Sequence, residues 1–168
     1  MNELEAMAAA VGEALKARGE TVMVAESACG GLISAALLAV PGASAYYRGG
    51  LVLYTTEARR KFLSQDGTDP FEGVTPSTEA YARAMARAVR ATLNPTWGLS
   101  EVGTAGPTGS KRGHGPGHAC LAVDGPRARA VTVETRQSDR VTNMQVFARA
   151  ALELLAALLQ ETPRNPTV

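Results

Sequence analysis

The chain has 168 residues, of which 45% are hydrophobic and 20% are charged, a composition that suits one globular domain with a sizeable core. A formal net charge of +1 and an aromatic content of 5% argue against nucleic-acid binding, which uses a basic surface or stacking rings. The two cysteines form no disulfide framework, no apolar stretch has membrane-spanning length, and the first residues do not form a signal peptide. We therefore expect a cytoplasmic protein that binds neither nucleic acid nor a membrane.

The first part of the chain alternates between helical and strand patterns. Apolar residues recur at helical spacing where helices are predicted, and compact or β-branched residues form short runs where strands are predicted. The predicted elements are, in chain order, an amphipathic helix (4–18), a buried strand (22–25), an apolar helix ending near 39, a strand (51–55), a short helix capped by Thr55 or Thr56 (57–63) and a long helix that opens at Thr75-Pro76 (75–93).

The remainder of the chain is richer in strands. The predicted elements are strands over 97–102, 119–123 and 128–135, and a final helix that begins after Ser138 or Asp139 and ends near 160. Asp124-Gly125-Pro126 is a hairpin signal between the last two strands. Alternating helices and strands predict the α/β class, and the hairpin makes the sheet mixed. We expect one domain over residues 1–161 and a disordered tail over 162–168.

The most informative stretch is the turn that joins the predicted strand at 22–25 to the following helix. The strand ends in Glu26-Ser27, and Gly30-Gly31 then leads into the helix. Glycines let a ligand approach the backbone closely, and the free amides of a helix's first turn can bind an anion or an oxyanion. Ser27 stands where a nucleophile or polar ligand contact would stand. The alternative is that Ser27 and Gly30 only cap the helix.

A second glycine-rich stretch, residues 103–109 (GTAGPTG), follows a predicted strand and can present several amides to an anion. It is not a P-loop, because the required Gly-Lys-Ser/Thr ending is replaced by Gly109-Ser110-Lys111. The alternative is a purely structural turn.

His114, His118 and Cys120 have the residue types of metal ligands. The intervening Gly-Pro-Gly excludes the helical geometry that would make their spacing meaningful, so we expect no metal and assign Cys120 to the core.

Together these residues resemble the CinA C-terminal domain family of competence/damage-inducible proteins. Residues 25–31 (AESACGG) are similar to the family's AESCTGG signature, and the resemblance runs from about 11 to 158. The other matching segments are 40–47 (VPGASAYY), 54–59 (YTTEAR), 103–107 (GTAGP) with Pro116-Gly117, and Asp139-Arg140 with Asn143.

The resemblance implies a single three-layer α/β/α domain that self-associates as a dimer or higher homo-oligomer. Active members of the family hydrolyse nicotinamide mononucleotide to nicotinic acid mononucleotide and ammonia, without a metal or other cofactor. The serine that matches Ser27 is taken as the nucleophile, and a tyrosine and a lysine of the YSNEAK motif lie near it. Their positions here are Tyr54 and Arg59.

The same resemblance implies a substrate pocket lined by the two glycine-rich turns, in which amides around Ala28 to Gly31 hold the oxyanion. Arg140, at the start of the last helix, is a candidate for the phosphate of a nucleotide ligand. The expected substrate-binding residues are Glu26, Cys29, Gly30, Gly31, Gly103, Thr104, Ala105, Gly106 and Arg140.

The departure from the family pattern is Arg59, which stands where the family has lysine. Arginine stays protonated in proteins, so Arg59 cannot be the general base that a serine nucleophile needs. Lys61 would lie roughly 200° around a helix from Arg59 and face away. Tyr54 and His118 remain as candidate bases. The threonine of the signature is also replaced, by Cys29.

Two hypotheses follow from these residues. In the first, the chain is an amidohydrolase of nicotinamide mononucleotide or a related amide, with Ser27 as nucleophile and catalytic roles for Tyr54 and Arg59. In the second, it is a catalytically silent relative that binds a nucleotide-like ligand or acts as an assembly module, with Arg59 as a contact to a phosphate or carboxylate.

Overall fold

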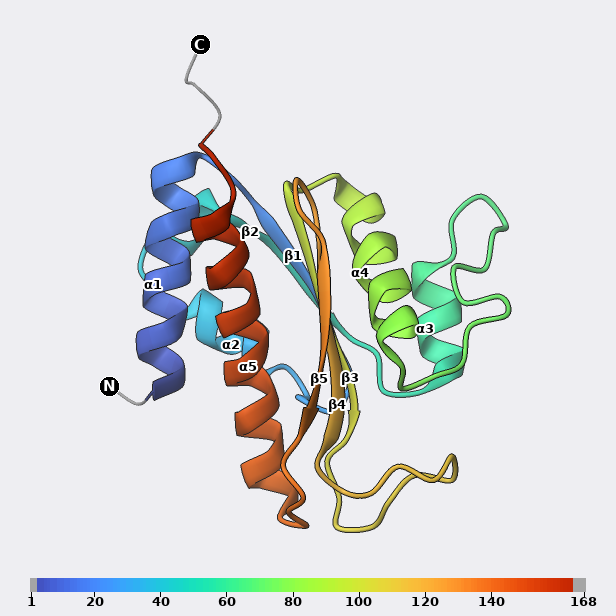
Figure 1. The fold of residues 1–168 in the computed structure, drawn as a ribbon. Coiled ribbons are helices and arrows are strands. Elements are labelled where there is room, and N and C mark those ends of the chain that lie inside the picture. The colour runs from blue at the N-terminus through green and yellow to red at the C-terminus, as the bar shows by residue number, and fades with distance from the viewer. Residues whose placement is uncertain (1–2, 165–168) are drawn as a thin grey trace.

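The computed structural model describes residues 3–164, which form one mixed sheet between two layers of helices (Figure 1). The strand order is β2-β1-β3-β4-β5, with parallel pairs β2-β1 and β1-β3 and antiparallel pairs β3-β4 and β4-β5. The elements are α1 (Glu3–Arg18), β1 (Val22–Glu26), α2 (Leu32–Leu38), the 3-10 helix η1 (Ala43–Ala45), β2 (Tyr47–Val52), α3 (Thr56–Leu63), α4 (Glu79–Leu93), β3 (Trp97–Thr104), β4 (His118–Asp124), β5 (Arg129–Glu134) and α5 (Arg140–Glu161). The predicted α/β class, mixed sheet and three layers are confirmed.

The two helical layers enclose two separate parts of the core. Helices α1, α2 and α5 cover one face of the sheet, and α3 and α4 cover the other (Figure 1). Every residue of β1 is buried, as expected for a central parallel strand with helices on both faces. The carboxyl ends of β1 and β3 therefore lie side by side, and the turn at Ser27 and the glycine-rich loop after β3 meet at the same edge of the sheet.

The prediction for the second strand was wrong by four residues at its start. We expected residues 51–55, but β2 is Tyr47–Val52 and contains the glycine pair that we had placed before the strand. A Cβ at Gly50 would lie 2.3 Å from the Ser34 hydroxyl oxygen, so glycine lets α2 pack closely on β2. The glycines in this strand thus serve the contact between helix and sheet and do not end the strand.

The long helix begins four residues later than predicted. Pro76 precedes the helix instead of occupying its first turn, and Ser77 has a positive φ of 61° that interrupts the backbone. The side chain of Thr78 accepts a hydrogen bond from the amide of Tyr81, and this cap starts α4 at Glu79. Asn94, in the left-handed conformation, ends the helix as predicted.

Helix α5 has the length and apolar composition of a membrane-spanning helix, contrary to our reading of the sequence. Its buried residues, which include Phe147, Leu152 and Leu155, pack in the core that α1 and α2 share with the sheet. Beyond α5, Arg18 donates hydrogen bonds to the carbonyls of Thr162 and Pro163. Residues 165–168 of the predicted tail lie outside the described part of the chain.

Gly98 of β3 should tolerate a side chain poorly. A Cβ at this position would lie 2.3 Å from the carbonyl oxygen of Ala86 and 2.8 Å from the Cβ of Arg90, both on α4. We expect Gly98→Ala to lower the free energy of unfolding by about 1–3 kcal/mol, because α4 would have to move off the sheet. Urea denaturation measures this loss.

The control is Gly115→Ala, where a Cβ would have no neighbour within 4 Å. That variant should stay within about 0.5 kcal/mol of wild type. Equal stability of the two variants would contradict the assignment of Gly98 to the contact between α4 and β3.

Candidate functional site

Two buried carboxylates occupy most of the amides in the turn between β1 and α2. The carboxylate of Glu26 accepts hydrogen bonds of 3.0, 3.0 and 2.9 Å from the amides of Gly31, Ile33 and Ser34. The carboxylate of Glu101, on β3, accepts from the amides of Ser27 at 3.0 Å and Cys29 at 2.9 Å. Glu26 is therefore the anion that caps α2, a role that replaces the expected contact to a substrate.

This arrangement corrects the oxyanion site expected at Ala28 to Gly31. The amides of Cys29 and Gly31 are bound by the two carboxylates, and the amide of Gly30 donates to the carbonyl of Ser27. Within that expected site, only the amide of Ala28 has no acceptor in the described structure. An oxyanion at this turn would therefore meet a single backbone donor from these four residues.

Ser27 is in contact with Arg59, the residue that replaces the family lysine. The Nη1 of Arg59 lies 3.4 Å from the hydroxyl oxygen of Ser27, and its Nη2 lies 3.5 Å from the carbonyl oxygen of Tyr54. Both bonds are longer than the usual 2.9–3.0 Å of an N–H···O bond. Ser27 is 4% exposed and Arg59 is 6% exposed. The guanidinium thus donates to the hydroxyl and does not accept its proton.

The guanidinium of Arg59 lies over the ring of Tyr81, 5.3 Å from its centroid, and that ring stacks on Phe71. Burial lowers the pKa of Arg59 from its ordinary value, whereas Tyr81 and Glu101 act in the opposite direction. Three buried polar atoms in the described chain have no hydrogen-bond partner: Nε of Arg59, the hydroxyl oxygen of Tyr81 and Oε1 of Glu101. Arg59 contacts the hydroxyl of Ser27, Glu101 binds its amide, and Tyr81 lies against Arg59.

A cleft of about 300 Å³ opens at this edge of the sheet. It is lined by Ala28, Tyr54, Gly103, Thr104, Ala105, Gly106, Thr108, Gly109, Ser110, Lys111 and Arg140. The glycine-rich loop predicted to contact a ligand therefore does line a cleft, and it does so together with the turn after Ser27. Lys111 and Arg140 give the cleft a positive charge, which suits an anionic ligand.

Arg140 connects three distant segments of the chain across this cleft. Its Nη1 donates to the carbonyl of Gly106 at 2.6 Å, and its Nη2 donates to the hydroxyl of Tyr54 at 3.1 Å. One turn later on α5, the buried amide of Asn143 donates to the carbonyl of Ala105 at 2.7 Å. The first turn of α5 thus fixes the loop that forms one wall of the cleft.

The remaining predicted site residues do not line this cleft. Cys29 is fully buried, its thiol donates to the carbonyl of Met144 at 3.7 Å, and burial raises its pKa well above the ordinary value. Gly30 packs near Met144, and Gly31 near Val52. These positions serve packing between the turn, β2 and α5.

His118 cannot act as the base for Ser27 in this structure. Its Nδ1 is bonded to Glu134 and its Nε2 lies 3.0 Å from the carbonyl of Ser77, so both ring nitrogens are occupied. His114 stacks on its ring at 3.9 Å between centroids. Within residues 3–164, no group of three or more histidine, cysteine, aspartate or glutamate side chains is arranged to hold a metal.

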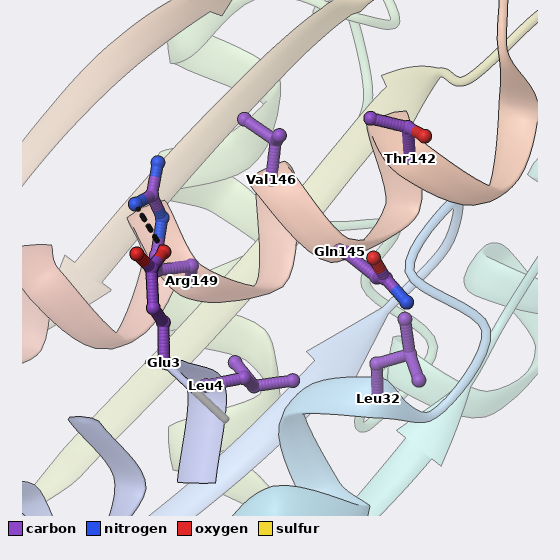
Figure 2. A pocket seen from close by; sticks show the side chains of 7 residues that line it. All are labelled: Glu3, Leu4, Leu32, Thr142, Gln145, Val146 and Arg149. Atoms are coloured by element: carbon purple, nitrogen blue, oxygen red, sulfur yellow. Dashed lines mark hydrogen bonds and ion pairs between the residues drawn. The ribbon is translucent and has the colours of Figure 1, made fainter. Parts of the chain in front are cut away.

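A larger hollow, of about 440 Å³, lies between α5, α1 and α2 (Figure 2). Glu3 and Arg149 form an ion pair of 2.9 Å at one end of it. Its other walls are the apolar side chains of Leu4, Leu32 and Val146 with Thr142 and Gln145. It contains none of the residues that surround Ser27, so the smaller cleft is the better candidate for chemistry.

A sequence model of the CinA C-terminal domain matches residues 4–159, almost the whole chain. The chain belongs to the CinA C-terminal domain family. The curated relatives agree: a CinA-like protein of Salinibacter ruber is 39% identical over 86% of this chain, and one of Gloeobacter violaceus is 37% identical over 90%. The chain spans about a third of the length of these relatives, 35% and 36%.

Solved structures of CinA proteins have the same fold as this CinA C-terminal domain. The competence damage-inducible protein A of Klebsiella pneumoniae has a TM-score of 0.88 and 27% identity, and the match covers 96% of this chain and 100% of that one. The competence/damage inducible protein CihA of Agrobacterium tumefaciens has a TM-score of 0.84 and 27% identity, with 94% and 96% covered.

Sequence reasoning missed two residues that shape the site of this CinA C-terminal domain. Glu101 lies in the buried part of β3, and a carboxylate in the middle of a buried strand is itself a signal of a specific partner. Tyr81 carried no such signal, because its position on the apolar side of α4 is that of an ordinary core residue.

The stability of this CinA C-terminal domain should depend on pH through Glu101. Complete burial raises the pKa of Glu101 from 4.5 to about 6, although the amides of Cys29 and Ser27 act against that rise. The folded state therefore holds the proton more tightly than the unfolded chain does. The stabilisation by this group is complete below pH 4.5 and is lost as the pH rises through about 6.

We expect the difference in unfolding free energy, wild type minus Glu101→Gln, to fall by about 2 kcal/mol between about pH 4 and pH 8. Urea denaturation at a series of pH values measures this difference. A difference that stays constant, or that rises with pH, would contradict the assignment to Glu101.

Proposed function

We propose that this domain binds a pyridine nucleotide in the cleft and hydrolyses its carboxamide, converting nicotinamide mononucleotide and water to nicotinic acid mononucleotide and ammonia. The observation that carries the proposal is the meeting of the turn after Ser27 with the glycine-rich loop and Arg140 around one positively charged cleft. Family membership adds the reaction class as an expectation. Because the chain covers only about a third of the length of its curated relatives, the proposal concerns this domain alone.

The chemistry requires Ser27 to attack the carboxamide carbon and form an acyl ester, with ammonia as the leaving group. Water then hydrolyses the ester and releases the acid. In this proposal the amide of Ala28 stabilises the oxyanion of each tetrahedral intermediate, and Arg59, whose Nη1 contacts the Ser27 hydroxyl, stabilises a negatively charged Ser27 oxygen. Tyr54, whose hydroxyl is held by Arg140 at the cleft, is the proposed proton carrier.

The contact between Arg59 and Ser27 favours a second candidate function, ligand binding without turnover. In the described structure the hydroxyl of Ser27 contacts the guanidinium, and no lysine or carboxylate accepts its proton. A domain of this kind would retain the cleft and its cations while lacking a general base. The two functions differ in whether ammonia is released.

An ammonia-release assay on nicotinamide mononucleotide separates the two functions. We expect wild type to release ammonia and Ser27→Ala to lower kcat at least roughly a hundredfold, because the nucleophile is removed. We expect Arg59→Lys to raise kcat, because a buried lysine can lose its proton. An inert wild-type protein with an active Arg59→Lys variant would establish the silent binder.

Arg140→Gln tests the cleft itself. This change removes a charge that faces the cleft while leaving a side chain able to donate to Gly106. We expect the KM for the mononucleotide to rise roughly tenfold, because the charge that would bind its phosphate is lost. We also expect kcat to fall, because the hydroxyl of Tyr54, the proposed proton carrier, loses the guanidinium that holds it. Arg149→Gln, at the other hollow, is the matched control and should leave both constants unchanged.

A further inference from the structure

Arg59 is a buried cation that contacts no carboxylate within residues 3–164. Its only hydrogen bonds are the long ones to Ser27 and Tyr54, and none of the ion pairs found among residues 3–164 includes it. The carboxylate of Glu101 acts on it through space but is bound to the amides of Ser27 and Cys29. A buried charge normally has an ionic or hydrogen-bonded partner, because its desolvation is costly.

The unpartnered atoms near this cation form a set suited to one chemical group. Nε of Arg59 is a buried donor without an acceptor, and the hydroxyl of Tyr81, a residue with no exposed surface, also lacks a partner. The guanidinium lies over the Tyr81 ring, which places both groups on the same side of the sheet. The free Nε of a planar cation and the unpartnered hydroxyl of the ring beneath it are two donors, which suits the two oxygens of a carboxylate.

The arrangement adjoins the cleft. Ala28, which lines the cleft, directly follows Ser27, whose hydroxyl contacts Nη1 of Arg59. Tyr54 also lines the cleft, and its carbonyl contacts Nη2. The guanidinium therefore contacts one residue of the cleft wall, Tyr54, and the chain neighbour of a second, Ala28. Both of its contacts are long bonds to neutral oxygens, and a bond to a negatively charged oxygen would be stronger.

We propose that Arg59 and Tyr81 form a carboxylate-binding subsite next to Ser27, so that the domain binds the acid form of its ligand more tightly than the carboxamide. The identity of the ligand as a pyridine mononucleotide rests on the proposed function, whereas the preference for an acid rests on Arg59. A carboxamide has the same shape but carries no charge, so it gains less from the guanidinium. In an active domain the acid is the product, and the subsite makes it a strong inhibitor.

The test compares the dissociation constants of nicotinic acid mononucleotide and nicotinamide mononucleotide by isothermal titration calorimetry. Both titrations use Ser27→Ala, which blocks turnover and retains Arg59 and Tyr81. We expect the acid to bind roughly tenfold more tightly than the amide. Equal affinities, tighter binding of the amide, or no binding of the acid at millimolar concentration would overturn the subsite.

Further variants in the same background assign the preference to its residues. Arg59→Gln should reduce the ratio of affinities to about one, and Tyr81→Phe should reduce it severalfold, because each removes a donor. Lys61→Gln, on the exposed side of the same helix, is the matched control and should keep the full ratio. Retention of the ratio in Arg59→Gln would overturn the assignment.

Two further measurements separate the subsite from misfolding of a variant and from the proposed function. Where Arg59→Gln is unfolded by circular dichroism, Arg59→Lys replaces it, and its ratio should fall below that of the parent because lysine lacks the planar fork. Ammonia release by the wild-type protein is scored separately. A preference for the acid without ammonia release contradicts only the proposed function, and release without that preference contradicts only the subsite.

Discussion

The capture of backbone amides by buried carboxylates determines the local structure at Ser27. Glu26 and Glu101 bind five amides between Ser27 and Ser34, so the turn after β1 is fixed from two strands at once. A helix N-terminus usually offers such amides to a ligand. Here the protein supplies the anions itself, and the neighbouring cleft is lined mainly by the end of β3 and the loop after it, with Lys111 and Arg140 as its cations. The cleft therefore lies along the glycine-rich loop, and most amides of the turn after β1 are occupied by the two carboxylates.

The two faces of the sheet contribute differently to the site. On the face covered by α1, α2 and α5, the first turn of α5 holds the glycine-rich loop through Arg140 and Asn143. On the opposite face, α3 and α4 bring Arg59 and Tyr81 together behind Ser27. The central parallel strands end between these layers, which is where α/β proteins commonly bind ligands. Each layer thus has a different role. The layer with α5 holds the backbone of the glycine-rich loop, and the layer with α3 and α4 supplies the buried cation Arg59.

Much of this architecture could be predicted from local patterns in the sequence. The hydrophobic periodicity of residues 4–18 and the hairpin signal at 124–126 depend only on neighbouring residues, and both elements were confirmed. The start of β2 could not be predicted, because Gly49-Gly50 reads as a break unless the packing of Ser34 against it is known. Similarly, the later start of α4 could not be predicted. The positive φ of Ser77, which interrupts the backbone before the helix, is not specified by any pattern of side chains.

The candidate site was less accessible to sequence reasoning than the fold. The pairing of Ser27 with Arg59 followed from a family motif, but the role of Glu26 as a helix cap depends on the path of the chain after β1. The contact of Glu101 with the amide of Ser27 joins residues 74 positions apart, a separation that no local pattern encodes. The amides expected to be free were occupied for this reason.

The position of Arg140 has a consequence for the charge of the ligand that the proposed site would bind. Its guanidinium already holds two neutral oxygens, from Gly106 and Tyr54. A phosphorylated molecule would exchange these neutral acceptors for a charged one, and that exchange is favourable. A nucleoside has no phosphate, so Arg140 would keep its hydrogen bonds to Gly106 and Tyr54 and would add no binding energy. Under the proposed function, this exchange would favour nucleotides over nucleosides.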